Sequence, residues 1–133
     1  MGRRLILDTG VLVAVERGRI SMRDVLDTDD DTAVSVITIT ELQVGVLRAD
    51  DTQRSKRQAA IDRARAVFTV IDYTPPIALS HAELLVHTRD TGTPRGPLDL
   101  IIAATARATG RTVVTLDRKA KFGDLPGLQT LEL

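Results

Sequence analysis

Short apolar segments alternate with longer helical ones along the whole chain. Five segments have the composition of β-strands and lie at residues 4–8, 32–37, 69–71, 112–116 and 128–133. This alternation predicts a parallel sheet, because a parallel connection must cross back over the sheet and usually does so as a helix. We therefore expect an α/β fold, a three-layer α/β/α sandwich with a central parallel sheet, in a single domain spanning residues 1–133.

The composition narrows the class of protein. Hydrophobic residues make up 43% of the sequence and aromatic residues only 2%, so the core must be aliphatic. No apolar run approaches the ~18 residues of a membrane span, and Asp8 interrupts the first run, so no signal peptide is expected. The absence of cysteine excludes disulfides and thiolate zinc sites, and zero net charge argues against a dedicated electrostatic nucleic-acid binder. We expect a cytoplasmic protein that does not associate with membranes.

Residues 97–117 carry the clearest functional signal. Pro97 suits the first position of a helix, Gly110 suits its end, and residues 112–116 follow as a strand. Asp99 stands at the start of this helix and Asp117 at the end of the strand. Helix starts and strand ends share one edge of a parallel sheet, where ligands bind, so both carboxylates should lie on the functional edge.

Two further acids should reach the same edge. Asp8 follows the first strand, and Glu41 lies one turn into the helix predicted over residues 38–49. Carboxylates that lie close together repel one another unless cations neutralise them. Because Mg²⁺ and Mn²⁺ take oxygen ligands, hold phosphates and activate water, the four acids indicate metal-dependent phosphoryl chemistry.

Each acid also has a local interpretation as a helix cap. Asp8 could cap the next helix, and Asp99 is a first-turn acid that the helix dipole favours. Asp117 could cap a turn at residues 118–120. Residues 38–41, with the sequence TITE, match a capping box in which Glu41 reaches back to the backbone of Thr38. A carboxylate can both cap and bind, so these interpretations remain open.

Four stretches carry a resemblance: LILDTGVLVAV, SVITITELQVGV, PLDLIIAATARATG, and TVVTLDRKAKF with the PGLQTL that follows. Taken together and in this order, they resemble the PIN-domain family, and within it the VapC-type toxins of bacterial toxin–antitoxin pairs. The resemblance covers most of the chain and implies a compact α/β/α sandwich. It also implies an endoribonuclease that depends on Mg²⁺ or Mn²⁺.

The resemblance assigns roles position by position. Asp8, Glu41 and Asp99 match the family's first, second and third acids. Asp117 falls where the family has a fourth acid or an asparagine, and Thr9 where it often has a small hydroxyl or amide residue; Thr115 is a further candidate beside Asp117. By this resemblance Asp8, Asp99 and Asp117 would bind metal, and all four acids would be catalytic.

The resemblance also implies a mechanism and partners. The metal would activate water for in-line attack on RNA phosphorus and would stabilise the leaving oxygen. The acidic pocket repels RNA, so positively charged side chains at its rim would have to bind the RNA backbone. The candidates are Arg89, Arg95 and the basic helix around residues 54–65. The family further implies a homodimer, and an antitoxin that pushes a basic side chain into the acidic pocket.

Two alternatives compete with this interpretation. In a receiver domain Asp72 would be the phosphoacceptor, but two adjacent acids after the first strand and a lysine after the fifth are not in place. In a catalytically silent PIN-like module, the acids would only dock a basic partner segment. Asp72 itself is interpreted as a cap outside the acidic set.

Overall fold

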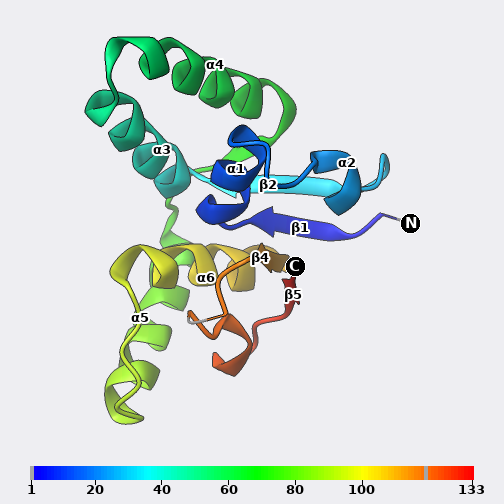
Figure 1. The fold of residues 1–133 in the computed structure, drawn as a ribbon. Helices are drawn as coiled ribbons and strands as arrows, with labels where there is room; N and C mark the ends of the chain where they lie inside the picture. The colour runs from blue at the N-terminus through cyan, green and yellow to red at the C-terminus, as the bar shows by residue number, and fades with distance from the viewer. Residues whose placement is uncertain (1, 119) are drawn as a thin grey trace.

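The computed structural model describes residues 2–118 and 120–133 and has one five-stranded sheet (Figure 1). The strands run in the order β3-β2-β1-β4-β5, and every neighbouring pair is parallel. Their bounds are Arg4–Leu7 for β1, Asp31–Ser35 for β2, Thr69–Ile71 for β3, Thr112–Thr115 for β4 and Thr130–Glu132 for β5. The prediction of five parallel strands is confirmed.

Helices connect the strands and cover both faces of the sheet. They are α1 (Thr9–Glu16), α2 (Met22–Val25), α3 (Val36–Arg48), α4 (Asp51–Val67), α5 (Pro75–Asp90) and α6 (Pro97–Thr109), with a 3₁₀ turn at Phe122–Asp124. Figure 1 shows α3 and α4 on one side of the sheet and α5 and α6 on the other. The three-layer α/β/α class is therefore confirmed. Within the described residues, no helix has the length and hydrophobicity to span a bilayer.

Two aliphatic cores fix this layering. Side chains alternate across a strand, so Leu5 and Leu7 of β1 enter one core while Ile6 enters the other. Leu5 and Leu7 pack with residues of α1, α2 and β2, and Ile6 packs with residues of α5 and α6. All three side chains are at most 1% exposed. An interior strand buried on both faces is the expected environment for this apolar run.

The helix after β2 begins earlier than the sequence pattern predicts. Ser35, rather than Thr38, is the N-cap of α3, and its hydroxyl accepts a hydrogen bond from the Ile37 amide at 3.1 Å. The strand predicted over residues 32–37 accordingly ends at Ser35. The capping-box interpretation of Thr38 and Glu41 is therefore wrong, because both residues lie inside the helix.

The sheet order places a crevice at its centre. The chain moves from β1 outward to β2 and β3, and then crosses back to β4 on the other side of β1. Ligands bind at such a reversal, outside the carboxyl ends of the strands. Asp8 and Asp117 follow the two strands that flank the reversal, so the topology brings them to this crevice. The order also differs from the 2-1-3-4-5 order of receiver domains, which argues against that alternative.

Candidate active site

Asp8 lies at the junction of β1 and α1 and is only 6% exposed. Its backbone amide donates to the Val114 carbonyl at 2.9 Å, which continues the pairing of β1 with β4. The Asp8 carboxylate accepts two hydrogen bonds of 2.9 Å, from the Thr9 amide at Oδ1 and from the Thr115 hydroxyl at Oδ2. Asp8 therefore does cap α1, as its local interpretation predicts, and the same bonds orient its carboxylate.

Glu41 reaches the site through a threonine hydroxyl. The Thr9 hydroxyl donates to Glu41 Oε1 at 2.7 Å, and the Thr9 and Thr38 hydroxyl oxygens lie 3.0 Å apart. Because the single hydroxyl proton of Thr9 goes to Glu41, the Thr38 hydroxyl is the donor in the second bond. Thr9 thus holds Glu41 with its side chain and Asp8 with its amide.

Asp99 occupies the third position of α6, directly above the N-cap residue Gly96. A Cβ atom placed on Gly96 would lie 2.9 Å from Asp99 Oδ2, so glycine makes room for this carboxylate. Partial burial is the main cause that raises the pKa of Asp99 to about 6, and the charges of Asp8, Asp117 and Glu41 contribute to the rise in that order. The structure therefore brings all four predicted acids within electrostatic range of one another.

Asp117 is joined to Asp8 by Thr115. The Thr115 hydroxyl accepts from the Asp117 amide at 2.9 Å while it donates to Asp8. Asp117 Oδ1 also accepts from the Ala120 amide at 3.2 Å, so its predicted capping role is confirmed. The predicted turn at residues 118–120 includes Lys119, which lies outside the described residues. Asp117 is exposed, whereas Thr115 is 1% exposed.

Among the described residues, no ion pair neutralises the charges of Asp8, Glu41 and Asp99. Burial raises the pKa of Asp8, the bonds from Thr115 and Thr9 oppose that rise, and the charges of Glu41 and Asp117 add to it. Asp8, Glu41 and Asp99 form no ion pair with any lysine or arginine that the structure describes. Carboxylate oxygens without a cationic partner are the donor set that a hard divalent ion fits.

A second acidic group lies far from this edge in the chain. Asp27, Asp29 and Asp30 have carboxylate oxygens within 4.8 Å of one another. No three of the four acids of the candidate site, Asp8, Glu41, Asp99 and Asp117, come that close. Asp30 pairs with Arg3 at 2.6 Å, and this contact holds the pKa of Asp30 well below its usual range. Arg3 therefore already compensates part of the negative charge of this loop.

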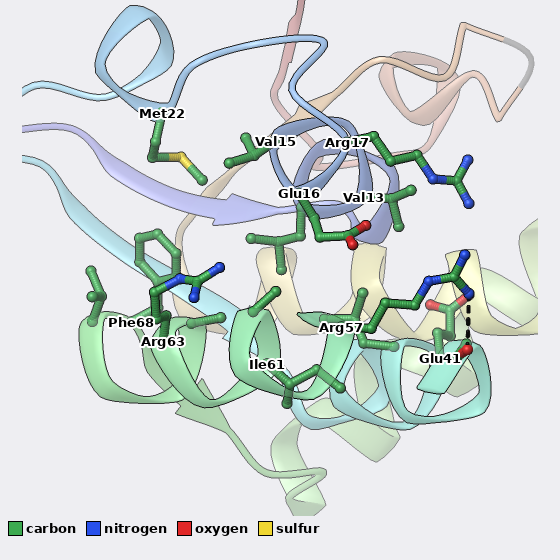
Figure 2. Close-up of a pocket in the computed structure, with 16 residues that line it drawn as sticks. Val13, Val15, Glu16, Arg17, Met22, Glu41, Arg57, Ile61, Arg63 and Phe68 are labelled. Carbon is green, nitrogen blue, oxygen red and sulfur yellow. Dashed lines mark hydrogen bonds between the residues drawn. The ribbon is translucent and has the colours of Figure 1, made fainter. Parts of the chain in front are cut away.

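The sequence did not predict a pocket of 440 Å³ between α1, α3 and α4 (Figure 2). Arg17, Arg57 and Glu41 lie at one end of this pocket, and Met22 and Phe68 lie at the other. Arg57 belongs to the predicted basic helix, and it donates to the Gly45 carbonyl at 3.0 Å. The basic pattern of that helix predicted Arg57 as a candidate contact residue. The apolar lining of the pocket could not be predicted, because it depends on how three helices pack together.

The raised pKa of Asp99 predicts a pH-dependent stability of the metal-free protein. The carboxyl has a pKa of about 6 in the folded state against 3.8 for an ordinary aspartate. As pH rises through this window the unfolded chain loses the proton first, so the free energy of unfolding falls. In EDTA, Asp99→Asn should melt roughly 3–5 °C above wild type at pH 7.5, and the two should converge near pH 4. Equal melting temperatures at every pH would contradict the assignment.

Comparison with known proteins agrees with this geometry. Residues 5–127 match the PIN domain family. The chain is 30% identical over 128 residues to ribonuclease VapC of Rickettsia bellii, covering 96% of this chain and 94% of the relative. It is 33% identical over 129 residues to ribonuclease VapC5 of Mycobacterium tuberculosis, covering 96% and 92%.

Solved structures give the same result. The fold superposes on VapBC2 from Rickettsia felis, crystallised with a promoter DNA fragment, with a TM-score of 0.88, 25% identity and 98% of each chain covered. It superposes on VapBC-5 from Mycobacterium tuberculosis, from a family of toxin–antitoxin systems, with a TM-score of 0.80, 27% identity and 98% of each chain covered. The chain belongs to the PIN-domain family, among the relatives named ribonuclease VapC.

Proposed function

We propose that this chain is a metal-dependent endoribonuclease and the toxin of a toxin–antitoxin pair, acting as one PIN-like domain in the cytoplasm. The observation that carries this proposal is the convergence of four acids from four segments, three of which have no cationic partner among the described residues. The relatives named ribonuclease VapC support RNA as the substrate. The absence of cysteine suits a reducing compartment.

The proposed cofactor is Mg²⁺ or Mn²⁺, held by Asp8, Asp99 and Asp117, with Glu41 completing the site. When bound, the cation would activate water and neutralise charge that develops on the phosphate. The chain's own residues supply orientation. Thr115 fixes Asp8 and the backbone of Asp117, and Thr9 fixes Glu41, so the carboxylates are held before any ligand arrives.

A cleavage assay tests the proposed function. Purified protein should cut single-stranded RNA with Mg²⁺ or Mn²⁺ and should stop in EDTA. Asp99→Asn keeps the shape of the side chain but removes its charge. Cleavage should therefore fall on the order of 100-fold or more, because loss of a direct metal ligand costs at least as much as loss of a residue that only orients a ligand.

Asp72→Asn is the control, because it makes the same substitution at an exposed acid that directly follows β3 and stands outside the four-acid group. It should cut RNA at the wild-type rate. RNA cleavage that survives EDTA or Asp99→Asn would overturn the proposal. No cleavage, with metal-free binding of a basic partner peptide, would favour the silent binding module instead.

Thr115 provides a second test, because it touches two acids without being one. Thr115→Val removes the hydrogen bonds to Asp8 and to the Asp117 amide while keeping nearly the same volume. We expect Mn²⁺ affinity, measured by calorimetry, to fall roughly 10–100-fold, as loss of such outer partners typically does. Thr115→Ser should recover most of the affinity. A valine variant that binds Mn²⁺ like wild type would show that Thr115 does not orient the site.

The proposed antitoxin site is the 440 Å³ pocket between α1, α3 and α4. Its apolar lining includes Leu12, Leu42, Ile61 and Phe68, which suits the apolar face of a partner helix. Glu41 lies at one end, so a segment seated in the pocket would reach the acids with its next residues. The solved toxin–antitoxin complexes of relatives support a protein partner for this chain.

The proposed homodimer would use the outer face of α5. Leu79 and Val86 are 67% and 56% exposed and lie two turns apart, with exposed Ala82 between them. An exposed apolar stripe of this kind marks a protein contact surface. The spacing of these three residues along α5 puts their side chains on one face of the helix.

Substitution of this stripe should separate the dimer. We expect wild type to have the mass of a dimer in light scattering, and Leu79→Lys with Val86→Lys to have the mass of a monomer with unchanged circular dichroism. Val67→Lys, which charges a 73% exposed apolar residue on α4, should remain dimeric. A monomeric wild type, or a double variant that stays dimeric, would exclude this interface.

A further inference from the structure

A second pocket, of 420 Å³, opens beside Asp117. Its lining is mainly apolar and includes Val13, Ala14, Ile20 and Leu116. Leu116 directly precedes Asp117 and is 37% exposed. An exposed apolar side chain therefore lies next to the acidic site. The lining also contains one cation, Arg19, and one residue without a side chain, Gly10.

The backbone places Arg19 at this pocket. Helix α1 ends at Glu16, and Gly18 follows its C-cap Arg17 with a φ of 73°, in the left-handed region that glycine adopts without strain. The Gly18 amide donates to the Val15 carbonyl at 3.1 Å, and the Arg19 amide donates to the Ala14 carbonyl at 2.9 Å. This pair of bonds is the Schellman motif, which reverses the chain direction at a helix end. Arg19 is thereby directed back along α1 to the pocket.

Helix α1 separates this pocket from the proposed antitoxin site. Val13 lines both pockets, while Gly10 and Ala14 line only the pocket at Asp117 and Leu12 and Glu16 line only the other. The two pockets therefore open on different sides of one helix, next to different acids. Glu41 belongs to the antitoxin side and Asp117 to the second pocket.

We propose that the pocket at Asp117 binds a nucleobase of the single-stranded RNA substrate, next to the scissile phosphate, and that Arg19 contacts the phosphate of that nucleotide. Apolar side chains accept the flat face of any base, and guanidinium groups bind phosphate in a bidentate manner. A positive group here also offsets the repulsion between RNA and the four acids. This assignment rests on the proposed ribonuclease function and names the subsite by which the substrate is held.

Gly10 offers a way to fill the pocket without disturbing the fold. A Cβ atom on Gly10 would meet no atom within 4 Å, so a side chain there enters open space. Gly10 also has a helical backbone in α1, which other residues adopt freely. Gly10→Leu should therefore melt at or above the temperature of wild type while it occupies the proposed base site.

Binding of labelled six-nucleotide RNAs, measured by fluorescence anisotropy in Mg²⁺, tests the proposal. All proteins carry Asp99→Asn so that the RNA is not cut. With Gly10 unchanged, an abasic residue at one position of the RNA should weaken binding at least about fivefold, the loss expected from one stacked base. With Gly10→Leu added, the intact RNA should bind as weakly as that abasic RNA, and the abasic position should no longer matter.

Arg19→Ala should weaken binding of every RNA in the series. It should also make the dependence of log affinity on log salt concentration less steep by about one, the change expected when one phosphate contact is lost. Arg23→Ala is its control, because Arg23 is an exposed arginine of α2, which lies near the amino-terminal end of β1 (Figure 1). Arg23→Ala should leave affinity and salt slope unchanged.

The outcomes separate this proposal from the proposed function. Suppose that the wild-type protein cuts RNA with metal, but an abasic residue still weakens RNA binding when Gly10→Leu is present. That result would support the proposed ribonuclease function and would overturn the base site. The base site would also be overturned if no abasic position mattered. If Gly10→Leu left RNA binding intact but broke the complex with the antitoxin, the pocket would belong to the protein partner.

Discussion

The buried carboxylate of Asp8 is the constraint on which the site depends. A charge at 6% exposure is costly unless hydrogen bonds compensate it, and here the Thr9 amide and the Thr115 hydroxyl do so. Both partners are neutral. A lysine or arginine in their place would also satisfy Asp8, but it would cancel the charge that the proposed cation needs. Neutral donors stabilise the carboxylate and leave the negative charge of the group in place.

The parallel sheet explains why these donors are available. Asp8 and Thr115 come from β1 and β4, which pair directly although they are far apart in sequence. Thr9 then starts α1 and meets Glu41 from the helix that follows β2. Three neighbouring strands thus deliver residues to one crevice, and each contact joins segments that the chain connects only by a long crossover.

Sequence reasoning located the elements better than the contacts between them. The strand alternation predicted the parallel sheet, and strand ends predicted Asp8 and Asp117, because both signals are local and periodic. The predicted start of α3 was wrong because the TITE pattern resembles a capping box, whereas the N-cap is Ser35, the last residue of β2 and itself buried. The link from Thr9 to Glu41 and the two pockets could not be predicted, because they arise from tertiary packing between helices.

The position of Val13 has a consequence for how proteins of this kind diverge. Its side chain lines both the pocket proposed for the antitoxin and the pocket proposed for a nucleobase. With these two occupants, a substitution at Val13 would reshape both surfaces in one mutational step, so a change in RNA affinity at this residue would also alter the fit of the inhibitor. Substrate binding and inhibition would then be coupled through one aliphatic side chain, and a lineage that changed one would have to adjust the other.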